Sequence, residues 1–186
     1  MTPIDPLSER IPDNLLREPL VFVFADHVRQ GVLCKAIENL LAFSDNPGEM
    51  DGGLRDRAET VLTYLKYELP SHIADEENDI LPLLRERTRP EDAFKDILRR
   101  IGRDHIEDNR RSQALIGGLE ELVEGKGPED PAAFSGTARL FAESHCNHLK
   151  WENEVLLPLA GKRLNENDLR EISRSMAARR DLSVPE

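Results

Sequence analysis

The chain has 186 residues, 5% of them aromatic, and a formal net charge of −11 from 25 basic and 36 acidic side chains. This length fits one domain with terminal extensions, and few aromatic residues beside abundant Leu, Ala, Glu and Arg favour helix over sheet. So acidic a chain is poorly suited to nucleic acid or to an anionic membrane, and we expect neither partner.

Signals for export or membrane insertion are missing from the sequence. The N-terminus has no basic segment followed by an apolar run, so we expect no signal peptide. No window approaches 18 apolar residues, so we expect no membrane-spanning segment. Cys34 and Cys146 form no Cys-x-x-Cys motif and predict no thiolate zinc site. The expected setting is therefore reduced and cytoplasmic.

Residues 1–16 contain three prolines among polar residues and are predicted to form an extended arm. The first helix should run from Pro19 to about Ser44. Its apolar spacings of three, four and seven predict a core-facing row made of Leu20, Phe24, His27, Cys34 and Leu41. Gly31 is unfavourable inside this helix. It either leaves space beside a bound ion or permits close packing of a neighbouring helix.

Helix-breaking residues set the limits of the second helix. Residues 45–53 are rich in Gly, Asp and Pro and predict a loop. The helix should run from about Leu54 to Arg87, with a kink at Pro70 and a distortion at Pro82. The Arg89-Pro90 pair predicts the next boundary.

The second half of the chain repeats this order. A third helix is expected from about Glu91 to Glu124, and a fourth from about Ala132 to Leu159, with Gly161 as its stop. Residues 166–180 predict a fifth amphipathic helix on the outside, and residues 181–186 should fray.

One stretch occurs twice. Each copy has a His, a Glu four residues later, and a Leu-Pro-Leu sequence further on. The first copy consists of His72, Glu76 and residues 81–83, and the second of His148, Glu152 and residues 157–159. Residues four apart share one face of a helix, so each copy presents an imidazole and a carboxylate together. Those are ligands suited to iron, manganese or zinc.

The repeat extends upstream, because His27 precedes the first copy and His105 the second at nearly the same distance. We interpret this as two helical hairpins that pack into a four-helix bundle with an internal two-fold repeat. A single His-x3-Glu pair is more often a surface or core-edge hydrogen bond. Two equivalent pairs on core-facing rows would be costly to bury without partners, so the sequence predicts a metal site.

These motifs resemble the hemerythrin HHE cation-binding family over about residues 17–160. The resemblance implies an all-α, up-down-up-down four-helix bundle around a non-haem di-iron centre with an oxo or hydroxo bridge, with Zn or Mn as substitute ions. It divides the chain into an N-terminal arm (1–16), the bundle (17–160) and a C-terminal helix with tail (161–186). It implies six ligands: His27 and His72 on one iron, His105 and His148 on the other, and Glu76 and Glu152 as bridges.

The third helix departs from the family's oxygen carriers, which have a second His one turn after the first. Here Asn109 stands four residues after His105. His145, three residues before His148, is an additional ligand, a hydrogen-bond partner of the ligands, or a half-exposed residue at the rim of the site. Asp108 is either a ligand or a solvated or capping residue.

Other residues near the motifs receive simpler interpretations. Glu77 and Glu154 are expected on the surface. Cys34 is expected to be a buried, inert thiol, with redox coupling to iron as the alternative.

Motifs of rival classes are missing from the sequence: the Glu-x-x-His of ferritin-like bundles, His-Glu-x-x-His and Gly-x-Ser-x-Gly. We favour a di-iron protein that binds or responds to dioxygen, nitric oxide or peroxide. The alternatives are an oxidoreductase that consumes peroxide and an iron-binding regulatory or structural module. The sequence decides neither whether the protein is an enzyme nor its oligomeric state.

Overall fold

The computed structural model describes residues 7, 10–44 and 52–182, and helices are the only regular structure in those ranges. The predicted all-helical class is therefore confirmed. Within the same ranges, no helix combines the length and the apolar character needed to cross a membrane. The predictions for residues 1–6, 45–51 and 183–186 lie outside the described residues.

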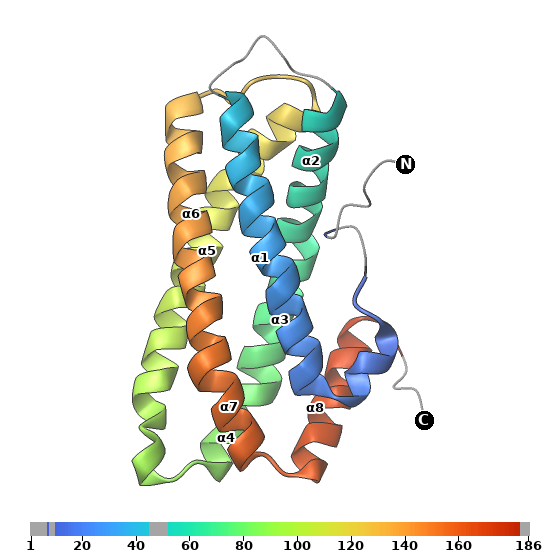
Figure 1. Ribbon diagram of the computed structural model, residues 1–186, viewed down its shortest axis with the longest axis vertical. Helices are drawn as coiled ribbons and strands as arrows, with labels where there is room; N and C mark the ends of the chain where they lie inside the picture. Colours follow the sequence, from blue (N-terminus) through green and yellow to red (C-terminus); the bar gives the residue numbers. More distant parts are fainter. Residues whose placement is uncertain (1–6, 8–9, 45–51, 183–186) are drawn as a thin grey trace.

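Helical stretches in the described part of the chain lie side by side along the long axis of the molecule (Figure 1). They are α1 (Pro19–Ser44), then α2 (Gly52–Thr63) with α3 (Leu69–Ala74) and α4 (Leu81–Arg87), then α5 (Phe94–Val123), and finally α6 (Pro131–Trp151) with α7 (Leu157–Arg163). α6 packs against both α1 and α5, and α2 packs against the same two helices. The stretches thus enclose one interior.

Three prolines lie inside these stretches without ending them. A proline lacks the N–H of a regular helix and clashes with the carbonyl four residues earlier. Each is preceded by a Leu and a π-helical segment: η2 (Tyr64–Glu68) before Pro70, η3 (Asp75–Ile80) before Pro82, and η5 (Glu152–Leu156) before Pro158. The N–H of Leu81 donates to the carbonyl of Glu76, five residues back, and that of Leu157 to Glu152. The wider π-helical turns accommodate all three prolines. The sequence predicted a kink at Pro70 and a distortion at Pro82.

Three helix limits differ from the prediction, whereas α1 has the predicted limits. α2 begins at Gly52, so Gly52 and Gly53 belong to the helix and not to the predicted loop of residues 45–53. Residues Pro90–Asp92 form a 3₁₀ turn, η4, and Ala93 has a left-handed φ of 50°, so α5 begins at Phe94 rather than near Glu91. Gly161 is not the stop of the fourth stretch, because α7 continues to Arg163.

The apolar core is divided into two clusters. One holds Leu33, Leu69, Leu115 and Ala142, and the other holds Val23, Ile80, Ile101 and Leu156, each with further apolar neighbours. In every helical stretch the predicted metal ligands lie between the residues of one cluster and those of the other. The fold therefore places a polar layer between two apolar ones.

The predicted fifth helix is present as α8 (Glu166–Arg179), which lies along the side of the bundle near the lower end of α1 in Figure 1, beside the 3₁₀ helix η1 (Asp13–Arg17). It packs against η3, η1 and α1. Asp168, near its start, accepts hydrogen bonds of 2.8 and 2.9 Å from Arg87. Near its C-terminus, Arg179 and Arg180 both donate to the buried carboxylate of Asp75 in η3.

Two local predictions on α1 are wrong. Phe24 is 51% exposed, because the buried row is centred on Val23, Gln30 and Ile37 and leaves Phe24 to one side. Gly31 is exposed, and a Cβ added there would meet nothing within 4 Å. Neither space beside an ion nor close packing of a helix explains this glycine.

Candidate metal centre

Six side chains predicted as ligands meet in the polar layer, and each is at most 4% exposed. They form two overlapping groups: His27, His72, Glu76 and Glu152 in one, and Glu76, His105, His148 and Glu152 in the other. Within each group the candidate ligand atoms all lie within 4.8 Å of one another. The two glutamates belong to both groups, which is the arrangement required to share two ions.

The imidazoles point their Nε2 atoms inward. His105 Nε2 lies 3.1 Å from Glu76 Oε2, and His148 Nε2 lies 3.1 Å from Glu152 Oε1. His27 Nε2 lies 3.6 Å from Glu76 and 3.5 Å from Glu152. The His27–His72 and His105–His148 ring centroids are both 5.0 Å apart, so the two halves have similar geometry.

The Nδ1 atoms point outward, each toward an oxygen. His27 Nδ1 lies 2.7 Å from Asn153 Oδ1, and His105 Nδ1 lies 2.8 Å from Glu77 Oε1. The longer pairs are His72 with Asp26 at 3.1 Å and His148 with Asp104 at 3.7 Å. At His27 and His105 the hydrogen-bond acceptor at Nδ1 favours the tautomer with its proton there and leaves the Nε2 lone pair for a metal ion. The Nδ1 atoms of His72 and His148 have no hydrogen-bond partner among the described residues.

Buried atoms without a hydrogen-bond partner are concentrated at this site. Among the described residues they include the Nε2 atoms of His27, His72 and His105 and both carboxylate oxygens of Glu76 and Glu152. The His105–Glu76 approach is short but lacks hydrogen-bond geometry. A buried polar group left unsatisfied costs about 1–3 kcal/mol. Metal cations bonded to these nitrogens and oxygens would satisfy them together, so the donor set fits a metal site.

Burial of two carboxylates requires positive charge nearby. Burial acts to raise the pKa of Glu76, but His72, His105 and His27 outweigh it and lower that pKa. Burial, together with the charge of Glu76, raises the pKa of Glu152. Burial acts to lower the pKa of His72, but Glu76 and Asp26 raise it to about 9. Positive charge is thus favoured beside the two buried carboxylates. Either a proton on His72 or a bound cation can supply that charge.

His145 does not belong to either group of candidate ligands. Its Nδ1 lies 2.7 Å from Asp108 Oδ2, and its Nε2 lies 2.7 Å from Gln30 Oε1. Both ring nitrogens are engaged, so neither is free for an ion. Asp108 is only 2% exposed, and Asn109 faces solvent. Asp108 is therefore a buried partner of His145 and not a solvated residue, and among the described residues His105 is the one side chain of α5 in the two groups.

The surface prediction holds for Glu154, which is exposed and lies 3.9 Å from Lys150. It holds for the exposure of Glu77 as well, but the sequence did not predict the contact that Glu77 makes. That residue is exposed, but its carboxylate turns back to His105 across the gap between η3 and α5.

The outer partners of the imidazoles were missed by sequence reasoning, although a signal was present. Asp26 and Asp104 directly precede His27 and His105, while Glu77 and Asn153 directly follow the two predicted bridging glutamates. Adjacent residues on a helix point about 100° apart. One can therefore face the centre while the other contacts a ligand on the neighbouring helix.

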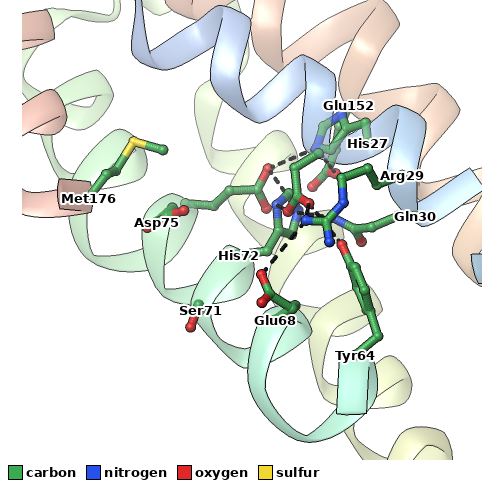
Figure 2. A network of polar contacts seen from close by, with 12 residues as sticks. His27, Arg29, Gln30, Tyr64, Glu68, Ser71, His72, Asp75, Glu152 and Met176 are labelled. Carbon is green, nitrogen blue, oxygen red and sulfur yellow. Dashed lines mark hydrogen bonds and ion pairs between the residues drawn. The ribbon is translucent and has the colours of Figure 1, made fainter. Parts of the chain in front are cut away.

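A polar network extends from His72 into α1. Tyr64 donates a 2.8 Å hydrogen bond to Asp26 Oδ1, and Gln30 donates a 3.3 Å bond to Asp26 Oδ2. Figure 2 shows the side chains of Tyr64, Arg29 and Gln30 converging beside His72. Burial raises the pKa of Tyr64, and the charge of Asp26 adds to this. Asp26 thus has several donors besides His72 and is fixed in place.

Two openings lead toward the site. A cavity of about 280 Å³ between α3 and α5 is lined by Leu69, Ile73 and Ile106 and reaches Glu77 and His105. A second cavity of about 350 Å³ lies between α5 and α6 and reaches His148. Both are of a size that suits small molecules.

A helical protein with a buried cluster of four imidazoles and two carboxylates falls in the class of metal-binding helical proteins. The family model of the hemerythrin HHE cation binding domain matches residues 22–160. The chain belongs to this family, and the resemblance predicted from the repeated His and Glu residues is confirmed. No curated protein and no solved structure matches the chain.

Proposed function

We propose that this protein holds two non-haem iron ions in an up-down-up-down four-helix bundle and binds or responds to dioxygen, nitric oxide or peroxide. The observation that carries the proposal is the pair of overlapping groups, in which two shared carboxylates lie between two pairs of imidazoles, and three of the four inward nitrogens have no hydrogen-bond partner in the described part of the chain. Residues 17–160 would form the metal-binding domain, with residues 1–16 and 161–186 as extensions. The setting we propose is the cytoplasm.

Each ligand has a proposed role. His27 and His72 would hold one ion, and His105 and His148 the other. Glu76 and Glu152 would bridge the two, completed by an oxo or hydroxo group. Imidazole and carboxylate donors suit iron, and also zinc or manganese as substitutes. Iron would supply reversible ligand binding and redox chemistry at coordination positions that the protein leaves open.

The residues around the site control access and orientation. Two apolar clusters flank the polar layer and limit the entry of water. Glu77 holds His105 at the end of the 280 Å³ cavity, whose walls include Ile73 and Ile106. A cavity of this volume with a partly apolar lining favours a small molecule over a large organic substrate.

The test is an optical spectrum of the iron-loaded protein before and after separate additions of dioxygen, nitric oxide and hydrogen peroxide. We expect a new absorption band with at least one of them, reversed when the ligand is removed. Sustained peroxide loss at catalytic iron concentrations would instead make the protein a peroxide-consuming oxidoreductase. An iron-loaded protein whose spectrum responds to none of the three would contradict the proposal and leave a structural or regulatory role.

A further inference from the structure

The two cysteines of the chain lie against each other. Cys34 is on α1 and Cys146 is on α6, two helices that pack together. Gln30, one turn before Cys34, lies 2.7 Å from His145, which directly precedes Cys146, and the two thiols are close enough to interact. Both thiols are free. The sequence predicted a buried, inert thiol at Cys34, but it gave no indication that the second cysteine would be its neighbour.

The two thiols differ in their access to solvent. Cys34 is 2% exposed, whereas Cys146 is exposed. The contact with Cys146, followed by burial, raises the pKa of Cys34. An oxidant from solvent therefore reaches the sulfur of Cys146 before that of Cys34.

We propose that Cys34 and Cys146 form a reversible disulfide between α1 and α6 when the protein meets hydrogen peroxide. The sulfur of Cys146 attacks one peroxide oxygen and the O–O bond breaks, giving a sulfenic acid and one water. The sulfur of Cys34 then displaces the hydroxyl group, which leaves as a second water with the remaining thiol proton. Two thiols are oxidised by two electrons in total and one peroxide is reduced. A dithiol reductant reverses the reaction.

The cross-link would lie close to the polar layer without using any of its candidate ligands. Gln30, one turn before Cys34, is the acceptor beside His145 Nε2 at 2.7 Å, and His145 directly precedes Cys146. A disulfide here would fasten α1 to α6 next to that contact. The chemistry is independent of the function proposed above, because it needs no metal ion.

The experiment treats the purified full-length chain with hydrogen peroxide, blocks the remaining thiols with a maleimide, and measures the intact mass. We expect the monomer to lose the mass of two hydrogens and to bind no maleimide, and dithiothreitol to restore two maleimide-reactive thiols. A digest without reductant should contain one peptide pair joined through Cys34 and Cys146.

Single substitutions supply the controls. In Cys146→Ser, the buried Cys34 should remain reduced under the same treatment. In Cys34→Ala, Cys146 should gain oxygen atoms or form a disulfide between two chains, and no internal disulfide can form. The proposal is overturned if the wild-type chain keeps both thiols, or if Cys146 gains oxygen while Cys34 stays reduced. Circular dichroism of each variant verifies that helix content is unchanged, and Cys34→Ser replaces Cys34→Ala if the alanine variant fails to fold.

Discussion

At the scale of single residues, the site is built from neighbours in the sequence whose side chains have different tasks. His27 faces the centre, while Asp26 beside it contacts His72 of the same half; His105 faces the centre, while Asp104 beside it lies near His148. The six inward donors could be predicted because their spacing repeats. Their outer partners could not be predicted, because a contact between two helices depends on which helices are adjacent and on how they are aligned along the bundle axis.

The ligand assignment predicts the metal content of variants. Glu152 belongs to both groups, so Glu152→Ala should lose both ions, whereas His72→Ala removes a donor from one group only and should lose at least that ion. Elemental analysis after anaerobic iron loading measures this. His145→Ala is the control: because His145 lies outside both groups, its iron content should match that of the wild type. Full iron content in Glu152→Ala would contradict the assignment.

The outer partner of His105 predicts a smaller effect. Removing a residue that orients a metal-binding histidine typically costs 10- to 100-fold in metal affinity, and we expect about that loss for Glu77→Ala. The measurement is a competition titration against a chelator of known affinity. Glu154→Ala is the matched control, since Glu154 is also an exposed acid beside the motif but contacts only Lys150. Equal affinities in the two variants would rule out the role of Glu77.

At the scale of elements, the π-helical segments are the feature that the repeat encodes. Pro82 and Pro158 each lie six residues after a shared glutamate, and the wide turn that accommodates each proline begins at or just before that glutamate. The sequence predicted irregular helix at Pro82 from the missing N–H alone. It could not distinguish a kink from a π-helical turn, because both relieve the same clash.

The contact between α8 and η3 could not be predicted from the sequence either. Asp75 is 1% exposed and directly precedes Glu76, and it accepts from Arg180 at 2.5 and 3.0 Å and from Arg179. An amphipathic pattern predicted the helix, but not the surface on which it packs. These arginines fix the segment that carries a shared glutamate.

Removal of one of these arginines should destabilise the fold. Breaking a buried ion pair typically costs about 3–5 kcal/mol, and we expect a loss toward the lower end for Arg180→Ala, because Arg179 remains. Chemical denaturation followed by circular dichroism measures the free energy of unfolding. Arg174→Ala, an exposed arginine of the same helix, should change it by less than about 0.5 kcal/mol. If the two variants were equally stable, α8 would not be held by this ion pair.

At the scale of the whole molecule, a polar layer between two apolar clusters accounts for both fold and site. The clusters supply the burial that drives helix packing, and the layer between them concentrates buried donors. The helical class and the family could be predicted because apolar periodicity and the His/Glu repeat agree. The cysteine contact could not, since Cys34 and Cys146 share no motif and meet only when α1 packs on α6.

The number of metal ions bound per chain tests the central claim most directly. After anaerobic loading with ferrous iron and removal of free metal, elemental analysis should find two irons per chain, one for each group of donors. A chain that retains no iron, or retains it equally after both Glu76 and Glu152 are replaced by alanine, would contradict the account.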